Sequence, residues 1–407
     1  MNTPKHITFI GLNYYPENTA IGLYSSQLVA FLEEQGYTIS VITAFPYYPH
    51  WEIAAAYKNK PKFFSEQKGN TTIYRYKQYT PKKPTFLKRV IHIIDFTIGS
   101  YFNLRKIKKS DLVIAIIPFT SAAFLGAIAK RRFKAKLWVH IQDFEFDAAF
   151  QSGLVQAEKK DKGIIHKLLM RLERSILNRA DKVSTISQSM MKMLARKTKQ
   201  PTYFLPNWVE KTSIDAYLEK PHAYLQSQKF KILYSGNIGD KQDWSFFLEF
   251  ADRIDSDRFE ISIVGAGAQR DYIAQEIKKR SGISLHPPVP YEELSSLLAS
   301  ADVHILFQKA AIRDTVMPSK ILGMMASNKP SIITGHPDSE VAVIIKNSQC
   351  GFYSSENEPS LVIEQLDTLF KNRDLGLEMG KKARDYVTKH YAKEEILKNF
   401  SKALNQL

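Results

Sequence analysis

The sequence contains a single cysteine, Cys350, among 407 residues. One cysteine excludes an internal disulfide, indicates no cysteine-ligated metal site, and favours a reducing compartment such as the cytoplasm. Long apolar runs are also missing, since the nearest one, residues 90–102, is interrupted by four polar side chains. The first five residues lead straight into a strand-like run without the pattern of a secretory signal. We therefore expect a cytoplasmic protein that does not cross a membrane.

Acidic residues are scarce in the first half of the chain. Residues 1–200 hold 32 Lys and Arg against 14 Asp and Glu, whereas residues 201–407 hold 25 against 27. The net charge of +16 therefore comes from the amino-terminal half. An imbalance confined to one half indicates an anionic partner, either nucleic acid or anionic lipid, and a solvated charged face is the simpler alternative.

The length and the order of predicted elements indicate two domains. A chain of 407 residues with 44% hydrophobic composition is too large for one ordinary core and fits two α/β domains. Strand-like and helical runs alternate in both halves, which predicts two Rossmann-like, doubly wound sheets that face a cleft. We expect a first domain over residues 1–207 and a second over residues 208–387. A carboxyl-terminal helix, about residues 388–407, is expected to cross back to the first domain.

Two glycine-rich loops follow strand-like runs in the second half. The first contains Gly236, Asn237 and Lys241, and the second contains Gly265 and Arg270. Open α/β sheets bind ligands at the carboxyl ends of their strands, and glycines there let the backbone approach a phosphate. Lys241 would neutralise a diphosphate as a compact charge. The alternative is a plain glycine turn followed by a surface lysine.

A third loop precedes a predicted helix and contains Asp314, Pro318, Ser319 and Lys320. Pro318 suits the first turn of a helix. A helix amino terminus that carries hydroxyl and ammonium groups attracts a diphosphate, whereas ordinary capping with a solvated lysine is the alternative. The three loops together predict a diphosphate site in the second domain.

The first half offers two candidate positions for substrate contacts. His140 and Asp143 stand three residues apart at the end of a predicted buried strand. His140 would donate to substrate hydroxyls or to the reacting centre, and Asp143 would orient it or contact a second substrate. Gly22 precedes the first helix and would let a donor phosphate or an acceptor come close. A satisfied strand-end histidine and a helix-entry glycine are the structural alternatives.

A basic stretch with an apolar middle lies between residues 79 and 109. Its first cations are Lys82, Lys83, Lys88 and Arg89, which we expect at an acceptor or membrane surface. Basic ends around an apolar centre are typical of a helix that lies on anionic lipid, and a core helix with charged ends is the alternative.

These motifs, taken in chain order, resemble glycosyltransferase family 4, and within it the glycosyltransferases of colanic acid and capsular polysaccharide biosynthesis. The stretches that carry the resemblance span nearly the whole chain: residues 13–24, 44–49, 140–143 (His-Ile-Gln-Asp), 183–187, 205–208 (Leu-Pro-Asn-Trp), 234–242 (Tyr-Ser-Gly-Asn-Ile-Gly-Asp-Lys-Gln) and 318–320 (Pro-Ser-Lys). Most of them are weak alone, but their joint order is specific.

The resemblance implies a GT-B fold and a retaining sugar transfer without a metal ion or other cofactor. It also implies a nucleotide-diphosphate sugar donor, GDP- or UDP-linked, held mainly by the second domain. Lys241 matches the family's diphosphate-binding lysine, Gly22 its amino-terminal glycine loop, and His140 its sugar-contacting histidine. The implied acceptor is a polyprenyl-diphosphate-linked glycan at the inner face of the cytoplasmic membrane.

The chain departs from the family pattern at two places. Asn237 stands where the family often has an arginine. Thr315 and Gly323 stand where it has a pair of glutamates, and the second of these usually holds the ribose. The residue that holds the ribose is therefore unassigned, with Asp314, Ser319 and Lys320 as substitutes.

Three other functions are alternatives at this point. A nucleotide-sugar epimerase or a hydrolase of GT-B fold would use the same donor without a sugar acceptor. A nucleic-acid-binding protein would explain the basic first half, but the second half is slightly acidic and the aromatic residues fall in predicted cores or loops. We therefore expect no nucleic-acid partner.

Overall fold

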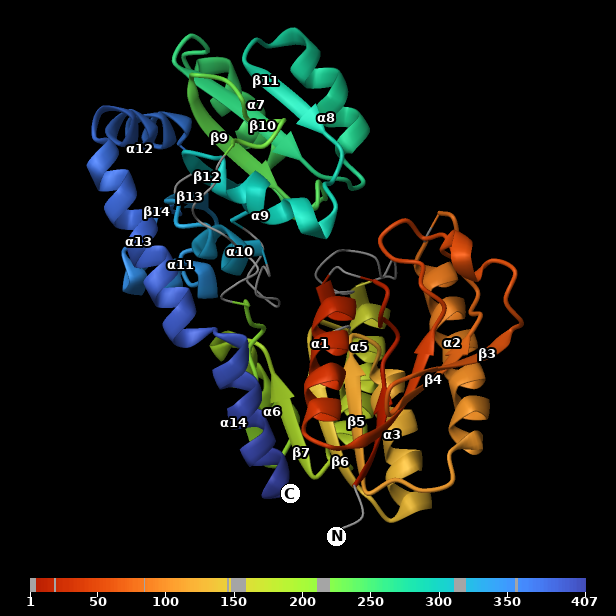
Figure 1. Cartoon of the computed structure of the whole chain (residues 1–407). Coiled ribbons are helices and arrows are strands. Elements are labelled where there is room, and N and C mark those ends of the chain that lie inside the picture. Colours follow the sequence, from red (N-terminus) through yellow and green to blue (C-terminus); the bar gives the residue numbers. More distant parts are fainter. Residues whose placement is uncertain are drawn as a thin grey trace. The chain divides into compact units, whose positions relative to one another are not determined.

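The chain folds into two compact units, drawn in Figure 1. The computed structural model describes residues 5–17, 20–83, 85–144, 146–147, 159–210, 220–310, 320–355 and 358–407. The first unit comprises Met1–Pro206 together with Leu397–Leu407, and the second comprises Asn207–Ile396.

The first unit is built on a single sheet. Within the described residues its eight strands lie in the order β3-β4-β2-β1-β5-β6-β7-β8, and all neighbours pair in parallel except β3 with β4. The strands are β1 (His6–Ile10), β2 (Thr38–Ala44), β3 (Phe63–Lys68), β4 (Thr71–Tyr76), β5 (Leu112–Ile117), β6 (Lys136–Ile141), β7 (Lys182–Thr185) and β8 (Thr202–Phe204). β5, with the sequence Leu-Val-Ile-Ala-Ile-Ile, is buried along its whole length, as expected for a central parallel strand.

Helices cover both faces of this sheet. They are α1 (Ala20–Glu34), the 3₁₀ helix η1 (Ala55–Tyr57), α2 (Phe86–Lys106), α3 (Thr120–Phe133), α5 (Lys159–Leu177), α6 (Gln188–Lys197) and the end of α14 (Lys393–Asn405). α3 contacts both α2 and α5, and α5 contacts α6, so these four helices follow one another along the sheet. The final helix belongs to the first unit from Leu397 on, where the Phe400 ring lies 4.8 Å from that of Trp138.

The second unit is built on an all-parallel sheet. Its six described strands lie in the order β11-β10-β9-β12-β13-β14, and each pairs with its neighbours in parallel. They are β9 (Phe230–Ser235), β10 (Phe259–Val264), β11 (Ile283–His286), β12 (Val303–Phe307), β13 (Ser331–Thr334) and β14 (Gly351–Ser354). The order reverses between β9 and β12, which places a topological switch point beside the loop that follows β9.

The helices of the second unit are α7 (Trp244–Arg253), α8 (Arg270–Glu276), η2 (Ile277–Lys279), α9 (Tyr291–Ala299), α10 (Lys320–Ala326), α11 (Glu340–Ser348), α12 (Pro359–Lys371) and α13 (Arg373–His390). Side-chain caps fix several of their starts. The Asp243 carboxylate accepts from the Phe246 amide at 3.1 Å, and the Ser339 hydroxyl accepts from the Ala342 amide at 3.0 Å. Each cap satisfies an amide that would otherwise lack a partner at a helix start.

The two α/β units with doubly wound sheets confirm the fold class expected from the sequence. How the two units face one another stays a prediction. The edge strands β3 and β11 were not anticipated, because most of their residues are partly or fully exposed and lack the apolar runs of the central strands.

Candidate functional site

The candidate donor site lies at the carboxyl ends of β9 and β10 in the second unit. The loop after β9 contains Gly236, Asn237 and Lys241, and the loop after β10 contains Gly265. Because β9 lies between β10 and β12, its loop adjoins the switch point, where parallel α/β sheets bind ligands. The structure thus brings together the two glycine-rich loops singled out in the sequence.

The two loops interlock through their backbones. The amide of Gly236 donates to the Val264 carbonyl at 2.9 Å, and the amide of Ile238 donates to the Ala266 carbonyl at 2.9 Å. A Cβ atom at residue 265 would overlap the carbonyl oxygen of Gly236. Gly265 is therefore required for loop-to-loop packing, a reason that the sequence pattern did not reveal. The packing holds the β9 loop in one conformation.

Lys320 joins this site from the first turn of α10. Its Nζ donates to the Tyr234 hydroxyl at 3.0 Å and lies 4.5 Å from the centre of that ring. The Tyr234 hydroxyl in turn donates to the carbonyl of Asn237 at 2.7 Å. Gly236 has a φ of +136°, and a Cβ there would come 3.3 Å from the Lys320 Nζ. The ammonium group therefore lies directly against the β9 loop.

Burial changes the charge state of Lys320. The side chain is partly exposed by surface area, but protein atoms surround its ammonium group, and this burial lowers the pKa of Lys320 to about 7. Burial raises the pKa of the Tyr234 hydroxyl, so Tyr234 stays neutral. A lysine that is only partly protonated near neutral pH gains its full charge when an anion arrives.

Lys241 and Asn237 lie on the exposed side of the same loop. Two hydrogen bonds on the buried side of the loop hold its backbone. The Gly239 amide donates to the Gln242 side chain at 3.0 Å, and the Trp244 indole donates to the Gly239 carbonyl at 3.0 Å. The Lys241 carbonyl accepts from the Lys309 amide at 3.2 Å. A rigid backbone therefore presents the Lys241 side chain to solvent.

Of the remaining donor residues predicted in the second half of the chain, the structure describes Arg270. Arg270 begins α8, half-buried, next to Gln269, whose amide group donates to the Asp240 carboxylate at 2.6 Å. Asp314, Pro318 and Ser319 lie outside the described residues, as does Thr315.

In the first unit, His140 lies in β6 and is 3% exposed. It is in register with Ser184 on β7, and its Nδ1 lies 2.9 Å from the Ser184 hydroxyl. The Gln142 amide nitrogen lies 3.0 Å from the His140 Nε2, so this nitrogen accepts and Nδ1 donates. Burial lowers the pKa of His140 to about 3, which keeps the ring neutral. Asp143 follows two residues after β6 and is partly buried.

Glu17 is a residue of the amino-terminal loop that the sequence patterns did not single out. Its buried carboxylate accepts from the amides of Tyr47 and Tyr48 at 2.7 and 2.9 Å, and from the Asn13 side chain at 2.8 Å. Burial raises the pKa of Glu17, and these hydrogen bonds oppose the rise. A Cβ at Gly22 would lie 2.6 Å from the Glu17 carbonyl oxygen, so Gly22 lets α1 start close to this loop. A single carboxylate in a loop leaves no periodic pattern in the sequence. Only its position directly after the run Asn-Tyr-Tyr-Pro could have drawn attention to Glu17.

The cations predicted for an acceptor or membrane surface lie around the start of α2. Lys82, Lys83, Lys88 and Arg89 are all exposed. The Arg89 guanidinium lies 5.4 Å from the centre of the Trp51 ring.

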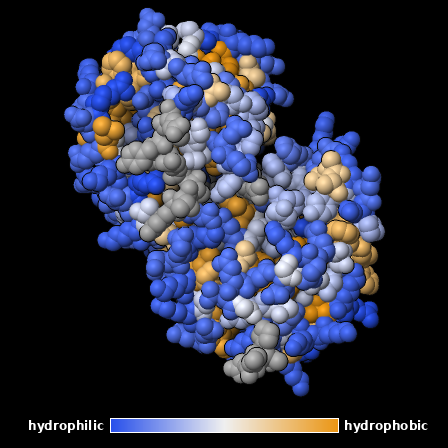
Figure 2. Space-filling view, in the orientation of Figure 1, coloured by the Kyte–Doolittle hydropathy of each residue, from blue (hydrophilic) through white to orange (hydrophobic). Residues whose placement is uncertain are grey.

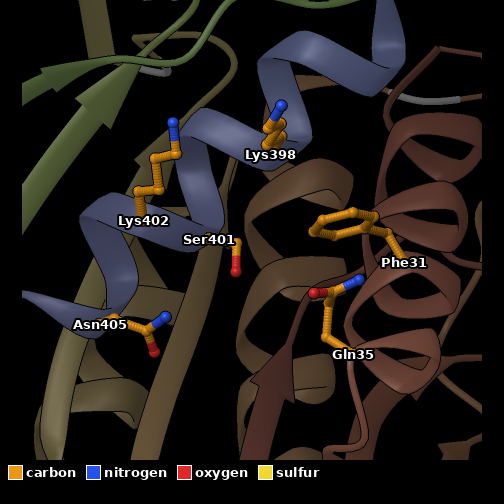
Figure 3. A pocket seen from close by; sticks show the side chains of 6 residues that line it. All are labelled: Phe31, Gln35, Lys398, Ser401, Lys402 and Asn405. Carbon is orange, nitrogen blue, oxygen red and sulfur yellow. The ribbon is translucent and has the colours of Figure 1, made fainter.

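A hollow of about 400 Å³ lies elsewhere in the first unit, between α1 and the end of α14 (Figure 3). Its lining residues are Phe31, Gln35, Lys398, Ser401, Lys402 and Asn405. None of these belongs to the predicted site. Over the described parts of the chain, His, Cys, Asp and Glu side chains do not gather in groups of three or more that could hold a metal ion.

Two protein-family models match the chain. One, described as "Glycosyl transferase 4-like domain", matches residues 19–208, and the other, described as "Glycosyl transferases group 1", matches residues 229–372. The chain is 32% identical over 413 residues to the colanic acid biosynthesis glycosyl transferase WcaI of Escherichia coli K12. That similarity covers 97% of this chain and 98% of the relative.

Solved structures of the same fold span nearly the whole chain. A sucrose-phosphate synthase from Thermosynechococcus elongatus matches with a TM-score of 0.76 at 14% identity, over 99% of this chain and 98% of that one. HepE of Anabaena, solved in complex with UDP-glucose, matches with a TM-score of 0.68 at 12% identity, over 99% and 100%.

The two Rossmann-like units and these structural neighbours define a GT-B fold, and the protein is a glycosyltransferase. Its family models and its relative show that the chain belongs to glycosyltransferase family 4. The resemblance drawn from the sequence is therefore confirmed.

Proposed function

We propose that the protein transfers a sugar from a GDP- or UDP-linked donor to a polyprenyl-diphosphate-linked glycan, with retention of configuration and without a metal ion. The product would enter an exopolysaccharide, a capsule or an O-antigen. One observation carries the proposal: the exposed Lys241 belongs to, and the Lys320 ammonium lies against, one glycine loop at the carboxyl edge of the second sheet. The similarity to WcaI, a glycosyl transferase of colanic acid biosynthesis, supports the polysaccharide part, and the similarity to HepE in complex with UDP-glucose supports the nucleotide-sugar part.

The donor diphosphate would bind between these two lysines. Lys320, held against Gly236, would supply a positive charge close to the backbone, and the exposed Lys241 would close over the other side. Two cations at one loop would offset the two negative charges of a diphosphate diester. Arg270, Asp314, Pro318 and Ser319 are further proposed contacts of the donor, with Asp314 and Ser319 as candidates for the ribose.

The transfer breaks the bond between the anomeric carbon and the diphosphate oxygen. The acceptor hydroxyl attacks from the same face, and the departing phosphate oxygen takes up the hydroxyl proton, so no protein base is needed. The two lysines and the amides near Gly236 would stabilise the negative charge that develops on the leaving diphosphate.

His140 and Asp143 are the proposed contacts to the sugar and the acceptor. Because burial holds the pKa of His140 far below neutrality, the ring acts as a neutral hydrogen-bonding group rather than as a proton donor. Its Nε2 would accept a hydrogen bond from a sugar hydroxyl only if the Gln142 amide group moved away.

The proposed acceptor is embedded in lipid, so the enzyme would work in the cytoplasm against the inner leaflet. No helix among the described residues combines the length and the hydrophobicity that a bilayer crossing demands. Lys82, Lys83, Lys88 and Arg89 would contact anionic headgroups.

Thermal stabilisation by nucleotides tests the donor site. The purified protein is melted with UDP, GDP, TDP, ADP and CMP, and we expect one base to raise the melting temperature. Lys241→Ala should shrink that rise, whereas the matched control Lys346→Ala, an exposed lysine on α11, should keep it. No rise with any nucleotide at millimolar concentration, or an equal rise with Lys241→Ala, would overturn the assignment.

Product analysis separates transfer from related chemistries that lack a sugar acceptor. We expect a labelled sugar to enter the lipid fraction only when the lipid-linked acceptor is present. Free sugar or an epimerised donor, formed equally well without the acceptor, would identify a hydrolase or an epimerase instead.

A further inference from the structure

Helix α2 exposes a row of aliphatic side chains. Leu87, Ile91, Ile94 and Ile98, here named the aliphatic face, are 67%, 44%, 53% and 53% exposed. Their spacing of three or four residues aligns them along one side of the helix. Tyr101, which is 40% exposed, continues the row towards the carboxyl end.

The buried side of α2 includes three polar side chains. His92, Ser100 and Asn103 are fully buried there, beside the apolar Phe96 and Leu104. A helix on the surface of a globular protein normally buries its apolar stripe and exposes its polar side. An aliphatic row that stays exposed while polar side chains of the same helix are buried indicates that the aliphatic face is kept for a partner rather than for the core.

Both ends of the aliphatic face are strongly basic. Between residues 82 and 109 the chain has eight Lys and Arg and one acidic residue, Asp95. All eight cations are exposed. Asp95 is engaged locally, since its carboxylate accepts from the Tyr76 hydroxyl at 2.8 Å and from the Tyr79 amide at 2.6 Å. The surface therefore combines an apolar centre with uncompensated positive charge.

Aromatic side chains widen this surface towards β3. Phe102, 47% exposed, meets the 38%-exposed Phe63 edge to face with ring centres 6.3 Å apart, and the Lys106 ammonium lies 5.1 Å from the centre of the Phe63 ring. Figure 2 shows hydrophobic residues at the surface in the region of α2. Arg132 of α3 donates to the carbonyls of Leu104 and Ile107 at 3.0 and 3.2 Å, which anchors the end of the helix.

We infer that the aliphatic face of α2 inserts into the headgroup region of a bilayer that contains anionic phospholipid, while the basic residues at both ends bind its headgroups. The inference rests on the proposed function, because a lipid-linked acceptor requires a lipid surface. Apolar insertion and electrostatic attraction reinforce each other at an anionic membrane. Nucleic acid offers no partner for a row of isoleucines, and a second copy of this chain would bring two sets of like charges together.

Vesicle sedimentation tests this inference. The full chain is mixed with phosphatidylcholine vesicles that contain or lack phosphatidylglycerol, and we expect binding only to the anionic ones. The double variant Ile94→Gln with Ile98→Gln should lower the vesicle partition coefficient by about tenfold or more. Both side chains are exposed, so the variant should keep its fold and its melting-temperature rise with the donor nucleotide.

A matched control uses the same change at exposed apolar positions of the second unit. Val343→Gln with Leu377→Gln alters side chains that are 51% and 63% exposed, and it should bind vesicles like the unaltered protein. The inference is overturned if the unaltered protein does not bind anionic vesicles, or if the α2 variant binds as well as the control. A dimer that the α2 variant abolishes, without vesicle binding, would identify a second copy as the partner. If no nucleotide raises the melting temperature of the unaltered protein, that result contradicts the proposed function and not the insertion of the aliphatic face.

Discussion

The burial of Lys320 predicts that donor affinity depends on pH. Its ammonium group lies against Gly236 and the Tyr234 ring, and burial lowers the pKa of Lys320 to about 7 in the free protein. A bound diphosphate restores the positive charge, so binding takes up a proton whenever Lys320 is neutral beforehand. Affinity should therefore fall as the pH rises above 7.

The expected change in donor affinity follows from the protonated fraction of Lys320. With a pKa of about 7, that fraction falls from about three quarters at about pH 6.5 to about one thirtieth at about pH 8.5. If the bound state is always protonated, the affinity falls by about twentyfold over this range. Below pH 6 the affinity should level off, because Lys320 is then protonated in the free protein as well.

Calorimetric titration with a nucleotide sugar measures the donor affinity at each pH. A nucleotide sugar is used because its esterified phosphates do not change their protonation in this pH range. Lys320→Arg keeps a positive charge at every pH and should flatten the profile, whereas Lys346→Arg should leave the profile of the unaltered protein. An equally flat profile for the unaltered protein would refute the role of Lys320. So would an unchanged slope in the Lys320→Arg variant.

Three further changes have expected outcomes. Gly265→Ala places a methyl group against the Gly236 carbonyl and should lower both the melting temperature and nucleotide affinity, measured together by thermal shift. Ser184→Ala removes the acceptor of the Trp138 indole and of the adjacent imidazole, and should cost about 1–3 kcal/mol in urea unfolding. Lys320→Met should raise the melting temperature, and more at about pH 6.5 than at about pH 8.5. The lowered pKa means that the unfolded chain binds more protons, so the stability of the unaltered protein rises with pH between about 7 and 10.5.

The central strands and the candidate donor loops could be predicted from the sequence because their signals are local. A continuous apolar run marks β5, a largely apolar run marks β10, and a glycine loop after such a run marks a ligand-binding edge. Edge strands such as β3 escaped prediction, since their alternating exposure weakens the apolar signal. Their pairing is decided by neighbours that are distant in the sequence.

Tertiary contacts explain why part of the site could not be predicted. The sequence could place Lys320 at a helix start, but its burial against Tyr234 depends on the side-by-side packing of β9 and α10. The sequence predicted a helix with an apolar middle on anionic lipid, with a core helix as the alternative. It could not tell which of the apolar side chains of α2 lie outside, and the structure shows that Leu87, Ile91, Ile94 and Ile98 are the exposed ones.

The most direct test of the account is transfer of a labelled sugar from the donor selected by thermal shift to a lipid-linked acceptor, with Lys241→Ala and Lys346→Ala beside the unaltered protein. We expect label in the organic extract for the unaltered protein and for Lys346→Ala, and a loss of about a hundredfold or more for Lys241→Ala. Label that is released only as free sugar, or near-normal transfer by Lys241→Ala, would contradict it.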